Sequence, residues 1–149
     1  LYSSAASDVY KRQVKLDRKK AEKKAERWQT IALGAAKQSK RMQIPTVHMP
    51  VTFQQALAMI AESDVRLMPY ENAEGMEGTR KILESIEPGE SIAILIGPEG
   101  GIDEAEVEMA MKEKVEPITL GKRILRTETA GMTVLSILVY LLEGRERTR

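Results

Sequence analysis

The sequence of 149 residues contains no cysteine, one histidine and few aromatic residues. Without cysteine, the chain can form no disulfide, no cysteine-based zinc site and no cysteine nucleophile. The longest apolar run, Thr133 to Leu142, has about half of the ~20 residues that a membrane-spanning helix needs, so we interpret it as a buried helix. These absences favour a cytoplasmic protein without a membrane anchor, and we expect no metal site.

Charge is distributed unevenly along the chain, although the formal net charge is only +1. Residues 1–49 contain 12 Lys and Arg against 4 Asp and Glu, a net +8, whereas residues 50–149 contain 11 against 18, a net −7. A basic N-terminal segment beside an acidic body indicates contact with a polyanion on one side. A solvated helix face would carry the same charges, so composition alone leaves both interpretations open.

Helices and strands are expected to alternate along the chain, which predicts an α/β fold with a parallel sheet. The run Ile92 to Ile96 is typical of a central strand that is buried on both faces. Thr52 and Asp103 are predicted helix caps, and Thr79 is the predicted start of a third helix. The expected helices cover residues 15–40, 53–61, 80–86, 104–112 and 127–143, and the expected strands cover residues 65–70, 92–96 and 117–120.

Two glycine-centred turns each follow a short apolar run and each precede a predicted helix. The first is GPEGG, Gly97 to Gly101, and the second is LGKRILRTETA, Leu120 to Ala130. Glycine lets a ligand approach the backbone closely because no Cβ stands in the way, and helix N-termini leave N–H donors free. The two turns together predict a ligand pocket built from backbone groups, although either turn alone is explained as an ordinary strand-to-helix connection.

Together with the segment AAKQSKR at 35–41, these motifs resemble the C-terminal half of the bacterial 16S rRNA uracil-N3 methyltransferases. That family is a branch of the SPOUT class of S-adenosylmethionine (SAM) enzymes, and the resemblance runs from about Val14 to Leu142. It implies a parallel sheet flanked by helices, with a C-terminal trefoil knot whose loops hold SAM. It also implies methylation of N3 of a uridine in small-subunit rRNA by a homodimer that pairs through helices beside the knot. Periodicity alone would predict an unknotted sheet.

The resemblance also predicts the domain organisation. The family begins with a small PUA-like RNA-binding barrel, followed by the first strand and helix of the methyltransferase domain, and neither pattern is found here. Residues 1–13 do not fit the family and resemble a translated cloning scar. We therefore interpret residues 1–13 as a non-native leader and residues 14–149 as an incomplete SAM-binding domain.

Both loops are expected to contact the cofactor, because in the family they close around it and backbone groups of the second loop bind adenine. Leu125 and Ala130 are equally well explained as core residues, and Glu99 as compensation of a helix dipole. The predicted cofactor-binding residues are Ile96, Gly97, Pro98, Glu99, Gly100, Gly101, Leu120, Gly121, Leu125, Thr129 and Ala130.

Arg126 and Glu128 are catalytic candidates, because the proton on the uracil nitrogen must be removed or the resulting anion stabilised. Arg126 would orient a carboxylate or a phosphate, or stabilise the uracil anion through its planar guanidinium. Glu128 would accept the proton or hold Arg126 in place. A structural Arg–Glu pair at the start of a helix is the alternative.

Arg41 is the third catalytic candidate and the first candidate for contact with the target nucleotide. Gln38 and Arg41 are three residues apart, which predicts that they share a helix face, and in the family this end of the helix borders the active site. Glu71 follows a predicted strand, where α/β sites form, and completes the substrate-binding candidates. A basic residue at a solvated helix C-terminus would explain Arg41 as well.

Three other functions stay open. The chain would also fit a SPOUT enzyme that acts on tRNA or on another base. It would fit a fragment that binds RNA or cofactor without catalysis. An ordinary nucleotide-binding α/β domain is the third alternative, and it would place an acidic ribose-binding residue near the end of its second strand.

Overall fold

The computed structural model of the chain describes residues 18–71, 73 and 75–146. The predicted leader, residues 1–13, lies outside the described residues. The chain divides into two compact units, Leu1–Ala56 and Leu57–Arg149, each of which is considered by itself. No helix in the described part of the chain is long and apolar enough to cross a membrane.

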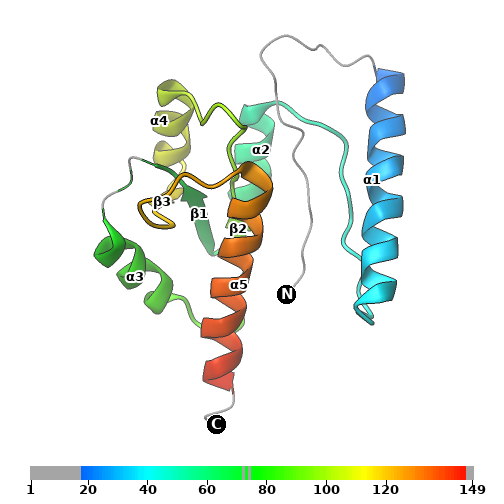
Figure 1. Cartoon of the computed structure of the whole chain (residues 1–149). Coiled ribbons are helices and arrows are strands. Elements are labelled where there is room, and N and C mark those ends of the chain that lie inside the picture. Colours follow the sequence, from blue (N-terminus) through cyan, green and yellow to red (C-terminus); the bar gives the residue numbers. More distant parts are fainter. Residues whose placement is uncertain (1–17, 72, 74, 147–149) are drawn as a thin grey trace. The chain divides into compact units, whose positions relative to one another are not determined.

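The first unit contains the helix α1, Arg18–Gln38, and the segment that follows it (Figure 1). The side-chain amide of Gln29 ties this segment to the helix. Its Nε2 donates to the carbonyl of Pro45 at 2.9 Å, and its Oε1 accepts the N–H of Val47 at 2.8 Å. Gln29 therefore pairs with the returning backbone as a neighbouring peptide group would.

The helix α1 ends in a tight turn at Lys40, which has a positive φ of 56°. The N–H of Lys40 donates to the carbonyl of Lys37 at 3.2 Å, and the N–H of Arg41 donates to the carbonyl of Ala36 at 2.9 Å. These two bonds form a Schellman motif. The prediction that Gln38 and Arg41 share a helix face is therefore wrong, because the left-handed residue between them turns the chain away from the helix.

The helix α2, Phe53–Ile60, begins with the predicted cap. The N–H of Thr52 donates to Gln55 Oε1 at 2.9 Å, and the N–H of Gln55 donates to Thr52 Oγ1 at 3.3 Å. This reciprocal pair is a capping box that satisfies two N–H groups at the helix start.

A three-stranded parallel sheet organises the second unit (Figure 1). Its strands are β1, Val65–Pro69, β2, Ile92–Ile94, and β3, Glu116–Ile118, in the order β2-β1-β3. The helices α3, Met76–Ser85, and α4, Glu104–Lys112, form the two crossovers, and α5, Thr127–Glu146, follows β3. This is the predicted α/β arrangement, but β1 lies between the other two strands where the sequence predicted β2.

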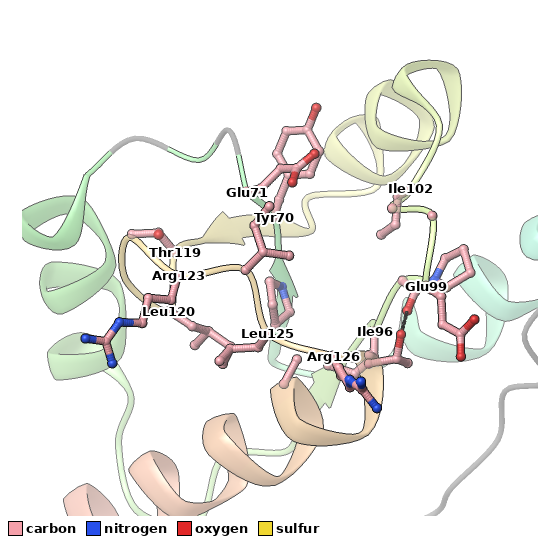
Figure 2. Close-up of a pocket in the computed structure, with 18 of the residues that line it drawn as sticks. Tyr70, Glu71, Ile96, Glu99, Ile102, Thr119, Leu120, Arg123, Leu125 and Arg126 are labelled. Atoms are coloured by element: carbon pink, nitrogen blue, oxygen red, sulfur yellow. Dashed lines mark hydrogen bonds between the residues drawn. The ribbon is translucent and has the colours of Figure 1, made fainter.

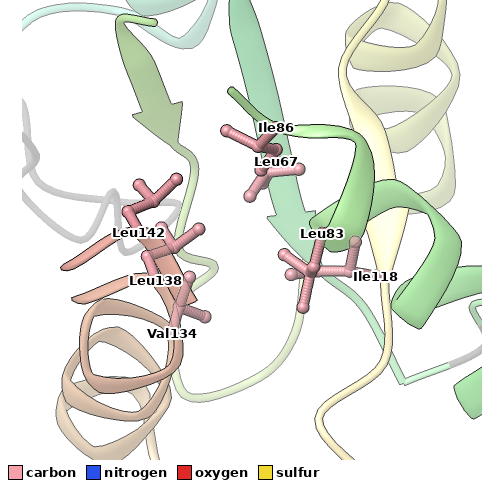
Figure 3. Close-up of a cluster of buried hydrophobic side chains, with 7 residues drawn as sticks. All are labelled: Leu67, Leu83, Ile86, Ile118, Val134, Leu138 and Leu142. Atoms are coloured by element: carbon pink, nitrogen blue, oxygen red, sulfur yellow. The ribbon is translucent and has the colours of Figure 1, made fainter. Parts of the chain in front are cut away.

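Both faces of the central strand are buried. Leu67 and Met68 have no exposed surface, and successive residues of a strand point to opposite faces. The face with Leu67 belongs to a core to which β1, β3, α3 and α5 all contribute (Figure 3). The members of this core are Leu67, Leu83, Ile86, Ile118, Val134, Leu138 and Leu142.

The helix α3 begins four residues earlier than predicted, at Met76. Its N-cap is Gly75, which makes no side-chain capping bond, so no polar side chain marks this start in the sequence. Thr79 consequently lies inside the helix and is only 3% exposed. The helix α4 begins as predicted, with Asp103 and Glu106 forming a capping box.

Asp64 and Ser91 join the residues that precede β1 and β2. Asp64 Oδ2 accepts the Ser91 hydroxyl at 2.6 Å and the Ser91 N–H at 2.8 Å, while the Asp64 N–H donates to Ser91 Oγ at 3.0 Å. The Ser91 hydroxyl, and then its N–H, hold the pKa of the Asp64 carboxyl below its ordinary value of 3.8. The pair fixes the start of the parallel register, in which Val65 lies opposite Ile92.

Replacing Asp64 with asparagine is expected to lower the melting temperature at pH 7, and this difference should shrink as the pH falls below 3.8 towards the lowered pKa of the folded state. The pKa of Asp64 is lower in the folded state, so its ionised form stabilises the fold above the ordinary value of 3.8. That contribution is lost as the pH falls through 3.8 to the pKa of the folded state. Thermal melting of both proteins across this range measures the difference, and a difference that does not change with pH would contradict the prediction.

Candidate functional site

A cavity of about 930 Å³ lies where all three strands end (Figure 2). One wall consists of residues 69–71 at the end of β1, a second of residues 96–102 after β2, and a third of residues 119–128 and 130 after β3. The carboxyl ends of parallel strands are where α/β proteins bind ligands, because successive loops leave the same edge of the sheet.

The first glycine loop turns sharply between β2 and α4. The N–H of Gly101 donates to the carbonyl of Pro98 at 2.9 Å, and Gly101 has a φ of 78°. A Cβ on Gly97 would lie only 2.6 Å from Cγ1 of Ile102. Glycine at 97 therefore lets the loop fold back onto Ile102 before the helix begins.

The second glycine loop is shaped by Thr119 and Gly121. Gly121 has a φ of 110°, in the region that favours glycine, and its N–H donates to Thr119 Oγ1 at 3.3 Å. The loop then carries Ile124 outward, 84% exposed, before α5 begins at Thr127.

The two loops meet at the start of α5. Thr127 Oγ1 donates to the carbonyl of Gly97 at 3.1 Å, across 30 residues of chain (Figure 2). Gly100 and Gly121 therefore line the same cavity, although 20 residues separate them in the sequence.

The lining combines apolar and charged side chains, a composition that suits a small ligand with both kinds of group. Ile96, Leu120 and Leu125 line the cavity and are half-buried. Arg126 and Glu128 form no ion pair with each other within the described residues, so the structural pair considered from the sequence is not formed. The charged residues of the lining are all exposed, namely Glu71, Glu99, Lys122, Arg123, Arg126 and Glu128.

Most residues expected at the site lie in this lining. They include Glu71, Arg126, Glu128 and every predicted cofactor residue except Thr129. Thr129 is half-buried on α5, and its carbonyl accepts the hydroxyl of Thr133 at 2.8 Å. Gln38 and Arg41 belong to the first unit and are not in the lining, so their roles stay predictions.

The lining also contains residues that the sequence did not suggest. Tyr70, Thr119 and Thr127 are among them. Thr127 lies inside the second motif and Thr119 directly before it, so the motif itself was the available signal. Tyr70 follows β1 directly, and the rule that α/β sites form at strand ends pointed to its position.

The cavity lies within a stretch of sequence that matches a known protein family. Residues 8–139 match the RNA methyltransferase domain family. The chain belongs to this family. The match includes all three walls of the cavity.

Named relatives agree with this assignment. Over 133 residues the chain is 43% identical to the ribosomal RNA small subunit methyltransferase E of Bacillus subtilis, and over 115 residues it is 37% identical to that of Mesomycoplasma hyopneumoniae. The alignments cover 87% and 77% of this chain but only 52% and 48% of the relatives. The chain thus spans about half the length of these proteins.

Two similar structures were solved with cofactor. A Legionella pneumophila protein described as a methyltransferase, in complex with bound SAM, has a TM-score of 0.77 and 32% identity over 90% of this chain and 53% of its own. The ribosomal RNA small subunit methyltransferase E of Neisseria gonorrhoeae, bound to S-adenosyl methionine, has a TM-score of 0.70 and 32% identity over 87% and 52%. The parallel sheet and flanking helices are therefore those of the methyltransferase fold.

Proposed function

We propose that this chain is the SAM-binding part of an enzyme that methylates N3 of a uridine in small-subunit rRNA. The observation that carries the proposal is the single cavity lined by both glycine loops, in a chain of the RNA methyltransferase family. The related proteins named as small-subunit rRNA methyltransferases support the choice of rRNA over tRNA.

The residues of the cavity fit SAM. A volume of about 930 Å³ lies within the range of roughly 300–1,000 Å³ typical of small-ligand sites. The half-buried side chains of Ile96, Leu120 and Leu125 offer an apolar surface for adenine. Glu99 and Arg126 carry the charges that a cationic amino group and a carboxylate need, respectively.

When bound, SAM would supply a methyl group activated by a sulfonium. The enzyme must hold the uracil nitrogen in line with that methyl group, and positioning supplies much of the rate acceleration. Glu128 would take the proton from N3, and the guanidinium of Arg126 would stabilise the negative charge that spreads over the uracil. The methyl carbon would pass to N3, with the electron pair of the broken sulfur–carbon bond left on sulfur, while Glu128 would hold the proton from N3.

Glu71 in the cavity lining would contact the RNA, and so, separately, would Gln38 and Arg41 in the first unit. Residues 1–49, with a net charge of +8, would attract the phosphate backbone. We propose residues 14–149 as the cofactor-binding domain, and a PUA-like barrel, where one is joined to it, as the main determinant of the target. We also propose that residues after Leu120 form the trefoil knot expected from the resemblance.

Calorimetric titration of the chain with SAM, NAD and ATP tests the proposed cofactor. We expect SAM to bind and NAD and ATP not to bind, because the chain belongs to the RNA methyltransferase family and two similar structures hold SAM. Binding of NAD or ATP but not of SAM would identify an ordinary nucleotide-binding domain instead.

Methyl transfer from radiolabelled SAM to unmethylated 30S particles, compared with bulk tRNA, tests the substrate. Label in 16S rRNA alone supports the proposal, and label in tRNA overturns it. SAM binding without transfer to either RNA would indicate a cofactor-binding fragment without catalysis.

We further propose that the enzyme is a cytoplasmic homodimer that pairs through α5. Leu138 and Leu142 on this helix are buried in the core, so neither is available for pairing. Met132, Leu135 and Val139 instead lie at helical spacing on the exposed face, with exposures of 62%, 43% and 37%.

Leu135→Lys is expected to convert a dimer into a monomer, because it places a charge within that apolar face. Sedimentation over a concentration series measures the change, and the far-ultraviolet dichroism of the variant should match the wild type. A wild-type chain that stays monomeric at every concentration, or a variant that still dimerises, would overturn the proposal.

A further inference from the structure

Thr79 is a buried polar residue on the side of α3 that meets the sheet. It is 3% exposed, and it is the one buried polar residue among those the structure describes. Its hydroxyl oxygen accepts the backbone N–H of Thr119 at 2.8 Å, across 40 residues of chain. Thr79 itself does not line the cavity.

Thr119 also contacts the second glycine loop through its side chain. Thr119 is the first residue after β3 and lines the cavity. Its hydroxyl accepts the N–H of Gly121 at 3.3 Å and lies 3.4 Å from the carbonyl of Gly121, to which it can donate. Gly121 is the residue with a φ of 110°, where the loop turns. Thr119 thus links Thr79 to Gly121, because its backbone N–H bonds to Thr79 and its hydroxyl bonds to Gly121.

We infer that Thr79 is a positioning residue that holds the second glycine loop in the conformation needed to bind SAM. This inference rests on the proposed function, because it concerns the same cavity. Thr79 would act through Thr119 and Gly121 and would touch neither the cofactor nor the RNA. It sets the point at which the chain leaves β3, and that point determines where the turn at Gly121 stands relative to the first loop.

Serine and valine at position 79 separate the hydroxyl from the shape of the side chain. Thr79→Val keeps the volume but leaves the N–H of Thr119 without its acceptor, whereas Thr79→Ser keeps the acceptor. We expect Thr79→Val to raise the Kd for SAM by about 5- to 30-fold, the usual effect of one such bond, and Thr79→Ser to retain nearly wild-type affinity.

Thr133→Val is the matched control. It removes a threonine hydroxyl that bonds only within its own helix, to the carbonyl of Thr129 at 2.8 Å. We expect it to leave the Kd for SAM unchanged. Thermal melting of all three variants shows how much of each change in the Kd for SAM is due to a less stable fold.

Amide hydrogen exchange supplies a readout that does not depend on SAM. In the wild-type chain, the amide of Thr119 should exchange much more slowly than that of Ile124, which is 84% exposed. Thr79→Val should accelerate exchange at Thr119 and Gly121, and Thr79→Ser should not. If the valine variant fails to fold, the wild-type exchange rates alone decide, because equal rates at Thr119 and Ile124 would overturn the inference.

The outcomes distinguish this inference from the proposed function. A wild-type chain that does not bind SAM defeats the proposed function, whatever the exchange rates are. A wild-type chain that binds SAM, with a folded Thr79→Val variant of equal affinity, defeats the inference alone. Loss of affinity that Thr79→Ser does not restore also defeats it, because the hydroxyl would then not be the cause.

Discussion

Replacing Gly121 with alanine is expected to weaken SAM binding by about 5- to 150-fold. Gly121 has a φ of 110°, a conformation that residues with a Cβ rarely adopt, and holding such a residue there costs about 1–3 kcal/mol. A Cβ at this position meets no atom within 4 Å, so the cost is conformational and not steric. The loop from 119 to 126 contains no helix or strand, so it relaxes locally and the penalty appears when the ligand binds.

Calorimetry with SAM measures this effect, and Gly34→Ala provides the control. Gly34 lies within α1 and has no positive φ, and a Cβ at this position would meet no atom within 4 Å. Alanine there should leave SAM affinity unchanged and raise stability by about 0.5–1 kcal/mol. Wild-type affinity in Gly121→Ala would contradict a role for this turn in the site.

Gly100 offers a contrast within the same cavity. Its φ is not positive, and a Cβ there also meets no atom within 4 Å. The backbone therefore tolerates a side chain at this position. Any loss of affinity in Gly100→Val would come from the volume that valine places in the cavity, whereas the loss in Gly121→Ala comes from backbone strain.

Replacing Leu138 with alanine is expected to lower the free energy of unfolding by about 2–5 kcal/mol. Leu138 is 1% exposed, and it belongs to the core that joins α5 to β1, β3 and α3. The change removes buried apolar surface and leaves a cavity that rigid neighbours on several elements cannot fill. Since the free energy of unfolding of a domain of this size is only roughly 5–15 kcal/mol, the substitution would remove a large share of it.

Urea unfolding followed by circular dichroism measures this change. Met111→Ala is its control, because methionine has as many side-chain heavy atoms as leucine but Met111 is 53% exposed on α4. We expect the control to change the unfolding free energy by less than about 1 kcal/mol. Similar losses in the two variants would show that α5 is not part of the core.

Local chemistry in the sequence was sufficient to predict the element order and several boundaries. Thr52 and Asp103 were predicted as helix caps and are confirmed, because a cap depends on residues within one turn. The start of α3 was predicted wrongly, because Gly75 caps it without a side chain. The strand β2 ends two residues before Ile96, because an apolar run does not show where pairing stops.

The residues of the candidate site were likewise predictable where a local motif marks them, and not where the contacts are distant in the sequence. The glycine motifs pointed to the two loops, since close backbone approach requires particular residues at particular positions. The contacts of Thr79 with Thr119 and of Thr127 with Gly97 span 40 and 30 residues, and no local pattern encodes such distant partners. Arg41 was placed on a helix because lysine at position 40 gives no sign of a left-handed turn, which glycine usually forms.

The three walls of the cavity come from separate stretches of chain that are neighbours only while the sheet is intact. An unfolded chain therefore has no binding site, and any ligand of this cavity selects the native state. A ligand at 100 times its Kd would add about 2.7 kcal/mol to the native state's advantage. In a cell rich in that ligand, the domain would be correspondingly harder to unfold and to degrade.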